Sequence, residues 1–234
     1  ACEGPGNTAA DADVTTTTTT TTNVVVAPAR PTPRSSPRKI VEFCCGPNSL
    51  IGQRAPENCN VVRLTEQEDM TSQSGLDFAL QSVSDSSMPT LLFASLPCTG
   101  GSPYQHMNWH AGEATRRLIR KHWRLFERLW KNFEIVARKA HEVGNKVAIE
   151  WPRGCSYWLL PKVQRLCKEL DLQYVDFDGC MLGLISIRTG KPIKKPWRIA
   201  TNVQSMRETF NNHLCCGHTE HTPCAGVETK RTRV

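Results

Sequence analysis

The strongest constraint on the fold comes from residues 91–108, where a short apolar run is followed at once by a cysteine and a pair of glycines. The run at residues 91–94 lies between prolines and predicts a buried strand of a parallel sheet. Cys98 follows Pro97 just beyond that strand, which is where open α/β sheets bind their ligands. The glycines at residues 100–101 would let another molecule approach the loop closely. A cysteine in this position is about as often a buried packing residue, so Cys98 by itself leaves both interpretations open.

Apolar runs and amphipathic segments alternate along residues 38–210. The clearest helix is predicted at residues 113–143, where apolar side chains recur every three or four positions before Gly144. Strands that alternate with helices predict a doubly wound α/β domain with a mostly parallel sheet. Further strands are expected at residues 39–45, 60–65, 146–152, 172–177 and 197–200, and further helices at residues 76–83 and 159–170.

The two ends of the chain differ in composition from the α/β region. Residues 1–37 contain an unbroken threonine run at residues 15–22 and a Pro/Arg/Ser segment, which predict a disordered leader because no apolar periodicity could bury a core. Residues 211–234 form a basic tail with cysteines and histidines. No apolar run is long enough to span a membrane, and no signal peptide is visible.

The net charge and the cysteine content indicate which partners and which redox environment the protein has. The net charge of +7 permits a polyanionic partner such as nucleic acid. The chain has eleven cysteines but is too long to be a small disulfide scaffold, so we expect an intracellular protein with mostly reduced thiols. A redox or zinc-binding protein that uses these thiols is the least favoured class, because no Cys-x-x-Cys pair occurs.

A candidate nucleotide-binding turn follows the first predicted strand. Glycine there admits close approach of a ligand, and the start of a helix offers free N–H groups. Because the full GxGxxG pattern is missing, the glycine pattern alone favours an ordinary strand-to-helix turn. The candidate residues of this turn are Phe43, Cys45, Gly46, Asn48 and Ser49.

Three carboxylates lie at or just after the ends of predicted strands. Glu66 comes 20 positions after Gly46, the spacing of the acidic residue that accepts hydrogen bonds from ribose hydroxyls in doubly wound folds. Asp69 belongs to the same acidic cluster, and a solvated acidic loop is the alternative interpretation of both. Glu150 lies near the end of a later strand and would face the same crevice as the cysteine described above.

A group of metal-ligand residue types lies near the end of the chain. The pattern C-x-x-H-x-x-H-x-x-C could close a tetrahedral zinc site. Typical zinc sites separate two ligand pairs by a longer loop, so an unligated tail is the alternative. The candidate ligands are Cys215, His218, His221 and Cys224.

Three of these stretches, in this order and at this spacing, resemble the cytosine-5 DNA methyltransferases. In that family a D-L-F-x-G-x-G motif binds S-adenosylmethionine, a P-P-C-Q-G-F-S motif contains the nucleophile and an E-N-V motif contains a glutamate. Here residues 42–49 read EFCCGPNS, residues 96–102 read LPCTGGS and residues 149–152 read IEWP. The resemblance covers roughly residues 39–202 and is closest to methyltransferase-like segments of dinoflagellate retroelement polyproteins.

The resemblance implies a Rossmann-like class I methyltransferase fold, S-adenosylmethionine as cofactor and DNA as the partner, in the nucleus. Cys98 would add to C6 of cytosine, Glu150 would hold and protonate N3, and Arg188 would take the place of a catalytic arginine. A target base in a duplex would first be flipped out. The cofactor would be held by Phe43, Cys45, Gly46, Asn48, Ser49, Glu66, Asp69 and Pro97.

The chain also departs from the family pattern. Leu96 replaces the first proline of P-P-C, Trp151 and Pro152 replace the asparagine and valine of E-N-V, and no Q-x-R-x-R motif accompanies Arg188. Only 50 residues follow Leu184, where the family places a target-recognition domain. A second function therefore stays open, that of a catalytically inactive nucleic-acid-binding module of a mobile-element polyprotein with a zinc-stabilised tail.

Overall fold

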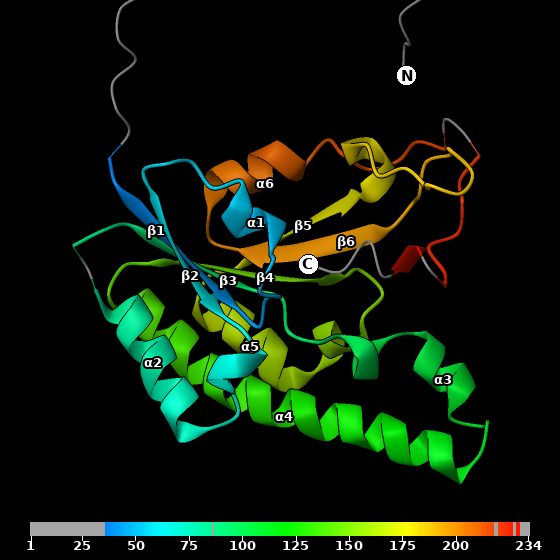
Figure 1. The fold of residues 1–234 in the computed structure, drawn as a ribbon, viewed down its shortest axis with the longest axis horizontal. Helices are drawn as coiled ribbons and strands as arrows, with labels where there is room; N and C mark the ends of the chain where they lie inside the picture. Colours follow the sequence, from blue (N-terminus) through cyan, green and yellow to red (C-terminus); the bar gives the residue numbers. More distant parts are fainter. Residues whose placement is uncertain (1–35, 86, 218–219, 227, 230–234) are drawn as a thin grey trace, which may run out of the picture. The chain divides into compact units, whose positions relative to one another are not determined.

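A six-stranded sheet lies at the centre of the fold in this computed structural model (Figure 1). The structure describes residues 36–85, 87–217, 220–226 and 228–229, so the predicted leader at residues 1–37 lies outside it except for its last two residues. The strands are β1 (Arg38–Phe43), β2 (Cys59–Leu64), β3 (Thr90–Ala94), β4 (Lys146–Pro152), β5 (Gln173–Asp178) and β6 (Pro196–Thr201). Their order across the sheet is β2-β1-β3-β4-β6-β5.

Helices cover both faces of the sheet. The α-helices are α1 (Leu50–Gln53), α2 (Gln73–Ser84), α3 (Tyr104–Asn108), α4 (Glu113–Glu142), α5 (Pro161–Glu169) and α6 (Gln204–Phe210). Short 3-10 helices are η1 (Glu66–Glu68), η2 (Thr99–Gly101), η3 (Ser156–Leu159) and η4 (Gly179–Leu182). Figure 1 shows α1 and α6 above the sheet and α2, α4 and α5 below it.

Each face of the sheet buries its own hydrophobic core. On the face covered by α2, α4 and α5, the rings of Phe43 and Phe133 meet edge to face with centroids 5.3 Å apart. On the opposite face, Phe177 of β5 stacks on Phe210 of α6 with centroids 4.5 Å apart. The central strands are therefore buried on both sides, which explains why their sequences read as continuous apolar runs.

The sheet is mostly parallel, as predicted, but it is mixed because β6 runs antiparallel to both of its neighbours, β4 and β5. A parallel connection needs a crossover of a dozen or more residues, usually through an α-helix. Between β5 and β6 the chain forms only the short turn η4 and an isolated bridge between Ile185 and Pro192. The chain therefore turns back on itself, which makes β6 antiparallel and the sheet mixed.

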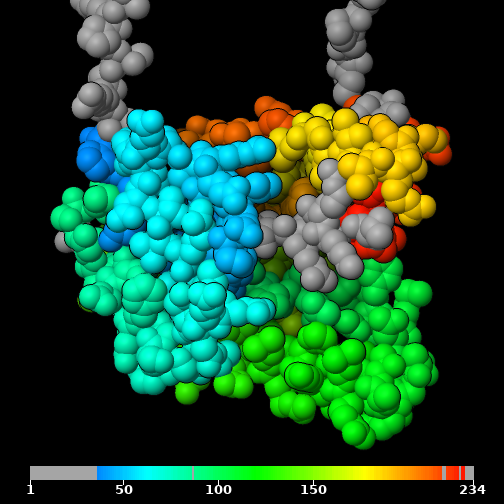
Figure 2. Space-filling model, in the orientation of Figure 1, coloured from blue at the N-terminus to red at the C-terminus, as the bar shows by residue number. Residues whose placement is uncertain are grey.

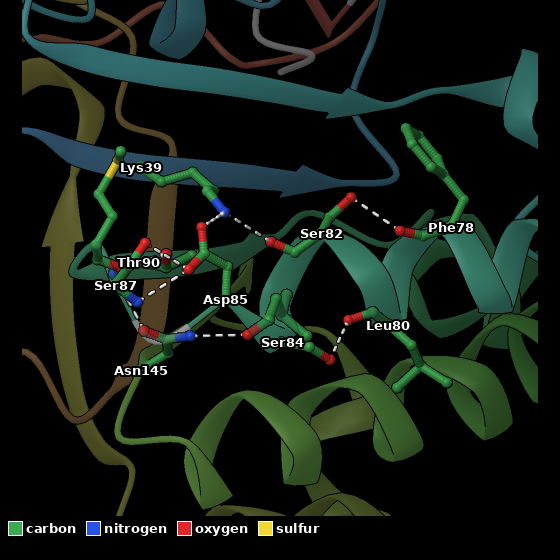
Figure 3. Close-up of polar contacts among 11 residues, drawn as sticks. Lys39, Phe78, Leu80, Ser82, Ser84, Asp85, Ser87, Thr90 and Asn145 are labelled. Carbon is green, nitrogen blue, oxygen red and sulfur yellow. Dashed lines mark hydrogen bonds and ion pairs between the residues drawn. The ribbon is translucent and has the colours of Figure 1, made fainter.

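Two buried polar side chains hold the amino ends of the strands in place (Figure 3). The ammonium of Lys39, which is 9% exposed, lies 3.5 Å from a carboxylate oxygen of Asp85. The side chain of Asn145 accepts a hydrogen bond from the Thr90 N–H at 3.2 Å and donates one to the Val83 carbonyl at 2.8 Å. These contacts fasten the amino ends of β1 and β3 to the end of α2.

The helices and strands confirm the main sequence predictions to within a few residues. The helix expected at residues 113–143 is α4, and the strand expected at residues 146–152 is β4. The helix expected at residues 159–170 is α5, which begins after the turn η3. Within the described residues, no helix combines the length and apolar character that crossing a membrane requires.

Candidate functional site

The carboxyl ends of the central strands lie level with one another. Phe43 of β1 pairs with Ala94 of β3, and Ala94 pairs in turn with Ile149 of β4. Three candidate stretches therefore lie at the same edge of the sheet. They are the turn after β1, the loop after β3 that contains Cys98 (the cysteine loop), and Glu150 of β4. The strand register alone brings together three stretches that the sequence analysis identified as candidates.

This edge also contains the point where the direction of the chain reverses. From β1 the chain crosses to β2 by way of α1 on one face, whereas from β3 it crosses to β4 by way of α4 on the other face (Figure 1). Open α/β sheets bind ligands in the crevice outside the carboxyl ends of the two strands that flank such a reversal. Here those strands are β1 and β3.

The loop that contains Cys98 is held by backbone and indole hydrogen bonds. The N–H of Ser95 donates to the carbonyl of Phe43 at 3.1 Å, and the indole N–H of Trp151 donates to the carbonyl of Leu96 at 2.8 Å. Trp151 is 1% exposed, so the residue that departs from the E-N-V pattern is a buried anchor for the cysteine loop. Cys98 itself is half-buried and directly precedes η2 as its N-cap residue, and its carbonyl accepts a hydrogen bond from the N–H of Gly101 at 3.0 Å.

The glycine pair after Cys98 leaves space for close packing, and the approach of a ligand to it stays a prediction. Both glycines are buried. A Cβ on Gly100 would lie 2.4 Å from the hydroxyl of Tyr157, and a Cβ on Gly101 would lie 2.6 Å from the sulfur of Cys155. The missing side chains thus make room for Tyr157 and Cys155 beneath the cysteine loop.

Replacing Gly101 by alanine is expected to destabilise the fold by about 1–3 kcal/mol, because the added methyl group overlaps buried side chains. Chemical denaturation measures the change. The matched control is Gly46→Ala, since a Cβ on Gly46 would meet no atom within 4 Å. Equal stability of the two variants would show that the space beneath the cysteine loop is not closely packed.

Glu150 is a buried carboxyl group with few partners. It is 9% exposed; its Oε2 accepts from the Ser95 hydroxyl at 3.4 Å, and its Oε1 has no hydrogen-bond partner among the described residues. Burial raises the pKa of Glu150 to about 7, while the positive charge of Lys195 and the Ser95 hydrogen bond act in the opposite direction. At neutral pH this carboxyl group can therefore be protonated and serve as a proton donor.

A second cysteine, Cys155, lies near both main candidates. Burial raises the pKa of Cys155 to about 12, and the negative charges of Cys98 and Glu150 add to the effect. The thiol of Cys155 therefore stays protonated near neutral pH and is not a competing nucleophile. The sequence analysis did not single out Cys155, Ser95 or Lys195, because no motif relates them to Cys98 along the chain.

The turn after β1 has an unusual backbone and an open side. Cys44 adopts a left-handed conformation with φ of 62°, which is rare for a residue other than glycine and is found at sites of functional strain. The space where Gly46 would have a Cβ is empty to 4 Å. Asn48 is exposed on the same turn. These features leave room for a molecule to lie against the backbone of the turn.

The other candidates of this turn face the protein interior. Phe43 and Cys45 are buried, and the hydroxyl of Ser49 donates to the buried carboxylate of Glu42 at 2.5 Å. That carboxylate also lies 3.5 Å from the guanidinium of Arg63. Phe43, Cys45 and Ser49 therefore support the turn, whereas Gly46 and Asn48 form its accessible side.

The three carboxylates of the acidic cluster after β2, those of Glu66, Glu68 and Asp69, differ in their contacts. Asp69 lies in a left-handed turn, and its carboxylate accepts from the N–H and the hydroxyl of Thr71 at 3.1 and 2.7 Å. Glu68 caps η1 by accepting from the N–H of Thr65 at 2.6 Å. Glu66 is exposed at the start of η1, just beyond the end of β2, and its carboxylate makes no hydrogen bond or ion pair with the described residues.

Arg188 and Pro97 complete the candidates from the resemblance. Arg188 is exposed in the β5–β6 connection, where its N–H donates to the Ser186 hydroxyl at 3.2 Å. Within the described part of the chain, no contact joins the Arg188 side chain to the cysteine or to the glutamate. The cation that acts on Glu150 is Lys195. Pro97 is exposed directly before Cys98.

The metal-ligand candidates of the tail are brought together only in part. The sulfur of Cys215 lies 3.4 Å from Nε2 of His221, and the third member of the group is Cys180 of η4. His218 lies outside the described residues. Cys224 is not part of the group whose ligand atoms lie within 4.8 Å of one another. The sequence missed Cys180 because it precedes Cys215 by 35 positions.

Two cavities of the fold differ in their position relative to this edge. One, of about 300 Å³, is lined by Gly100 and Ser102 together with residues of α3 and α4. The larger, of about 480 Å³, lies at the amino ends of β1, β3 and β4. Neither of these two cavities is lined by Cys98 or Glu150.

Comparison with protein-family models, with curated proteins and with solved structures found no match to this chain. The function that follows is therefore argued from the geometry of the site and the chemistry of its residues.

Proposed function

We propose that this protein transfers a methyl group from S-adenosylmethionine to C5 of cytosine in DNA, with Cys98 as the nucleophile. The observation that supports the proposal most directly is that Cys98, just after β3, and Glu150, near the end of the neighbouring β4, lie at the same edge beside the open turn at Gly46. A thiol, a carboxyl group that can hold a proton at neutral pH and a place for a cofactor are the groups that this chemistry requires.

The strand order supports the Rossmann-like class I methyltransferase fold that we propose. Without the antiparallel β6, the order of the sheet is 2-1-3-4-5. This order is one of the two common arrangements of doubly wound nucleotide-binding sheets, which bind their ligand at the reversal point between the first and third strands. The cofactor would then lie between the turn after β1 and the loop that contains Cys98.

The residues of the turn fit an adenosyl cofactor. The open space beside Gly46 would admit its approach to the backbone, and the exposed carboxylate of Glu66 could accept hydrogen bonds from ribose hydroxyls. Asn48 and Pro97 would border the same space, while Phe43, Cys45, Ser49 and Asp69 would shape it from behind. S-adenosylmethionine, when bound, supplies an electrophilic methyl group.

The proposed reaction begins with the two protein groups. The thiolate of Cys98 forms a bond to C6 of cytosine, and the electron pair of the C5–C6 double bond moves through the ring toward N3. Glu150 donates its proton to N3, which prevents negative charge from accumulating there. C5 becomes nucleophilic as a result. Once C5 carried the methyl group, a base would take the C5 proton and the C6–sulfur bond would break with return of its electron pair to Cys98. The proton on N3 would return to the carboxylate of Glu150, which restores the aromatic ring.

Binding of S-adenosylhomocysteine tests the cofactor site. We expect calorimetric titration of the protein to show binding, and a ligand at 100 times its Kd to stabilise the fold by about 2.7 kcal/mol. Gly46→Ala should weaken binding without loss of stability, because its methyl group would occupy the open side of the turn. Gly101→Ala is the converse control, since it affects packing below the loop. A folded protein that does not bind the ligand would favour a nucleic-acid-binding module without catalysis.

A further inference from the structure

We propose that Cys180, Cys215 and His221 bind a structural zinc ion that fastens the C-terminal segment, residues 213–229, to the connection between β5 and β6. The site goes beyond the proposed methyl transfer and does not depend on it. Its ligands also differ from those predicted from the sequence, because Cys180, which lies outside the tail, is one of them.

The spacing of the ligand atoms suits a tetrahedral ion. Sγ of Cys215 and Nε2 of His221 lie 3.4 Å apart, and the ligand atoms of all three residues lie within 4.8 Å of one another. At usual Zn–S and Zn–N bond lengths, a tetrahedral ion would hold a sulfur and a nitrogen about 3.6 Å apart. Two sulfurs and an imidazole nitrogen form a donor set that selects zinc over harder cations. The fourth position of the tetrahedron would be taken by a water molecule or by a further side chain.

Hydrogen bonds orient Cys215 within the group. Its N–H donates to Oδ2 of Asp178 at 2.9 Å, and its sulfur accepts from the N–H of Gly217 at 3.3 Å. Asp178 is 2% exposed and lies two residues before Cys180, so both cysteines are positioned by the end of β5. Donors to the ligating sulfur and fixed supporting groups are typical of metal sites.

The described part of the C-terminal segment is held by polar contacts and not by a hydrophobic core. Among its described residues, none contributes a buried hydrophobic side chain to either core. Figures 1 and 2 show its red residues beside the yellow residues that follow β5. The contacts there are polar, such as the Thr222 N–H to the Pro192 carbonyl at 2.8 Å and the buried Ser186 hydroxyl to Glu228 at 2.5 Å. Segments that cannot build a hydrophobic core often use a metal ion instead.

The proposed ion would also steady one wall of the candidate site. Gly179, directly before Cys180, donates its N–H to the carbonyl of Lys195 at 2.9 Å. Asp178 lies 3.9 Å from the guanidinium of Arg153, which follows β4. The zinc site and the residue whose charge acts on Glu150 are therefore parts of one hydrogen-bonded connection.

Zinc content of the purified full-length chain tests the proposal. Binding would release the protons of two thiols and leave His221 neutral. We expect about one zinc ion per chain by elemental analysis, and at least about a tenfold reduction in Cys180→Ser. The matched control is Cys59→Ser, which removes a half-buried thiol of β2 outside the group and should retain the ion. Full zinc content in Cys180→Ser would overturn the proposal.

A measurement on the unaltered protein guards against variants that fail to fold. Titration with Co²⁺ should give thiolate-to-cobalt charge-transfer absorption and the visible bands of a tetrahedral ion. A metal chelator should lower the Tm of the wild type and expose the C-terminal segment to proteolysis. No cobalt absorption by folded, reduced protein, or a disulfide between Cys180 and Cys215 in protein purified without reductant, would overturn the proposal. None of these readouts depends on methyl transfer, so a failure here is distinguishable from a failure of the proposed function.

Discussion

Cys98→Ala is expected to abolish methyl transfer to cytosine-containing DNA, with a loss on the order of 10³-fold or more. Without the sulfur no bond can form at C6, and C5 of cytosine remains a poor nucleophile. The fold should persist, because Cys98 is only half-buried and its loop is held by the backbone of Ser95 and Leu96. Transfer of a radioactive methyl group from S-adenosylmethionine to DNA measures the effect.

A covalent trap separates the role of the sulfur from a role in binding. In DNA that contains 5-fluorocytosine, the C5 position cannot lose a proton, so a wild-type adduct at C6 should survive denaturation. Cys98→Ala should form no such adduct. Cys155→Ala removes the neighbouring thiol, whose pKa burial raises to about 12, and should still form it. Undiminished methyl transfer by Cys98→Ala would rule out Cys98 as the nucleophile.

The positions of the strands along the chain could be predicted from the sequence, because a buried strand is recognisable as a local run of apolar residues. Residues 91–94 and 146–152 read as apolar runs, and the structure buries them as β3 and β4 between two layers of helices. The direction of β6 left no such pattern, since it depends on how the chain returns from β5. Helical periodicity likewise located α4 to within one residue of its end.

The details of the site depended on contacts between distant residues, which a linear pattern does not encode. The roles of the glycines after Cys98 are set by Tyr157 and Cys155, more than 50 positions later. Lys195 reaches the neighbourhood of Glu150 only because β6 pairs with β4. Cys180 joins Cys215 for a similar reason, because the tail returns to the end of β5.

The buried carboxyl group of Glu150 should make the stability of the fold depend on pH. Burial raises its pKa from 4.5 to about 7, so the folded protein binds this proton more tightly than the unfolded chain does. The stabilisation from this group is fully present below pH 4.5 and is lost as the pH rises through about 7. The total change in the free energy of unfolding from this group is on the order of 3 kcal/mol.

Glu150→Gln is expected to remove this decline, because the amide stays neutral at every pH in the range. Urea denaturation of wild type and variant between pH 4.5 and pH 8 measures the difference, which should be largest at the alkaline end. The variant should at the same time lose about 10²- to 10⁴-fold in methyl transfer, since it cannot donate a proton to N3. Glu66→Gln, at an exposed carboxylate, should keep the wild-type pH dependence. Parallel stability curves for wild type and Glu150→Gln would mean that Glu150 is ionised in the folded protein, and the proton that the proposed reaction delivers to N3 would then need another source.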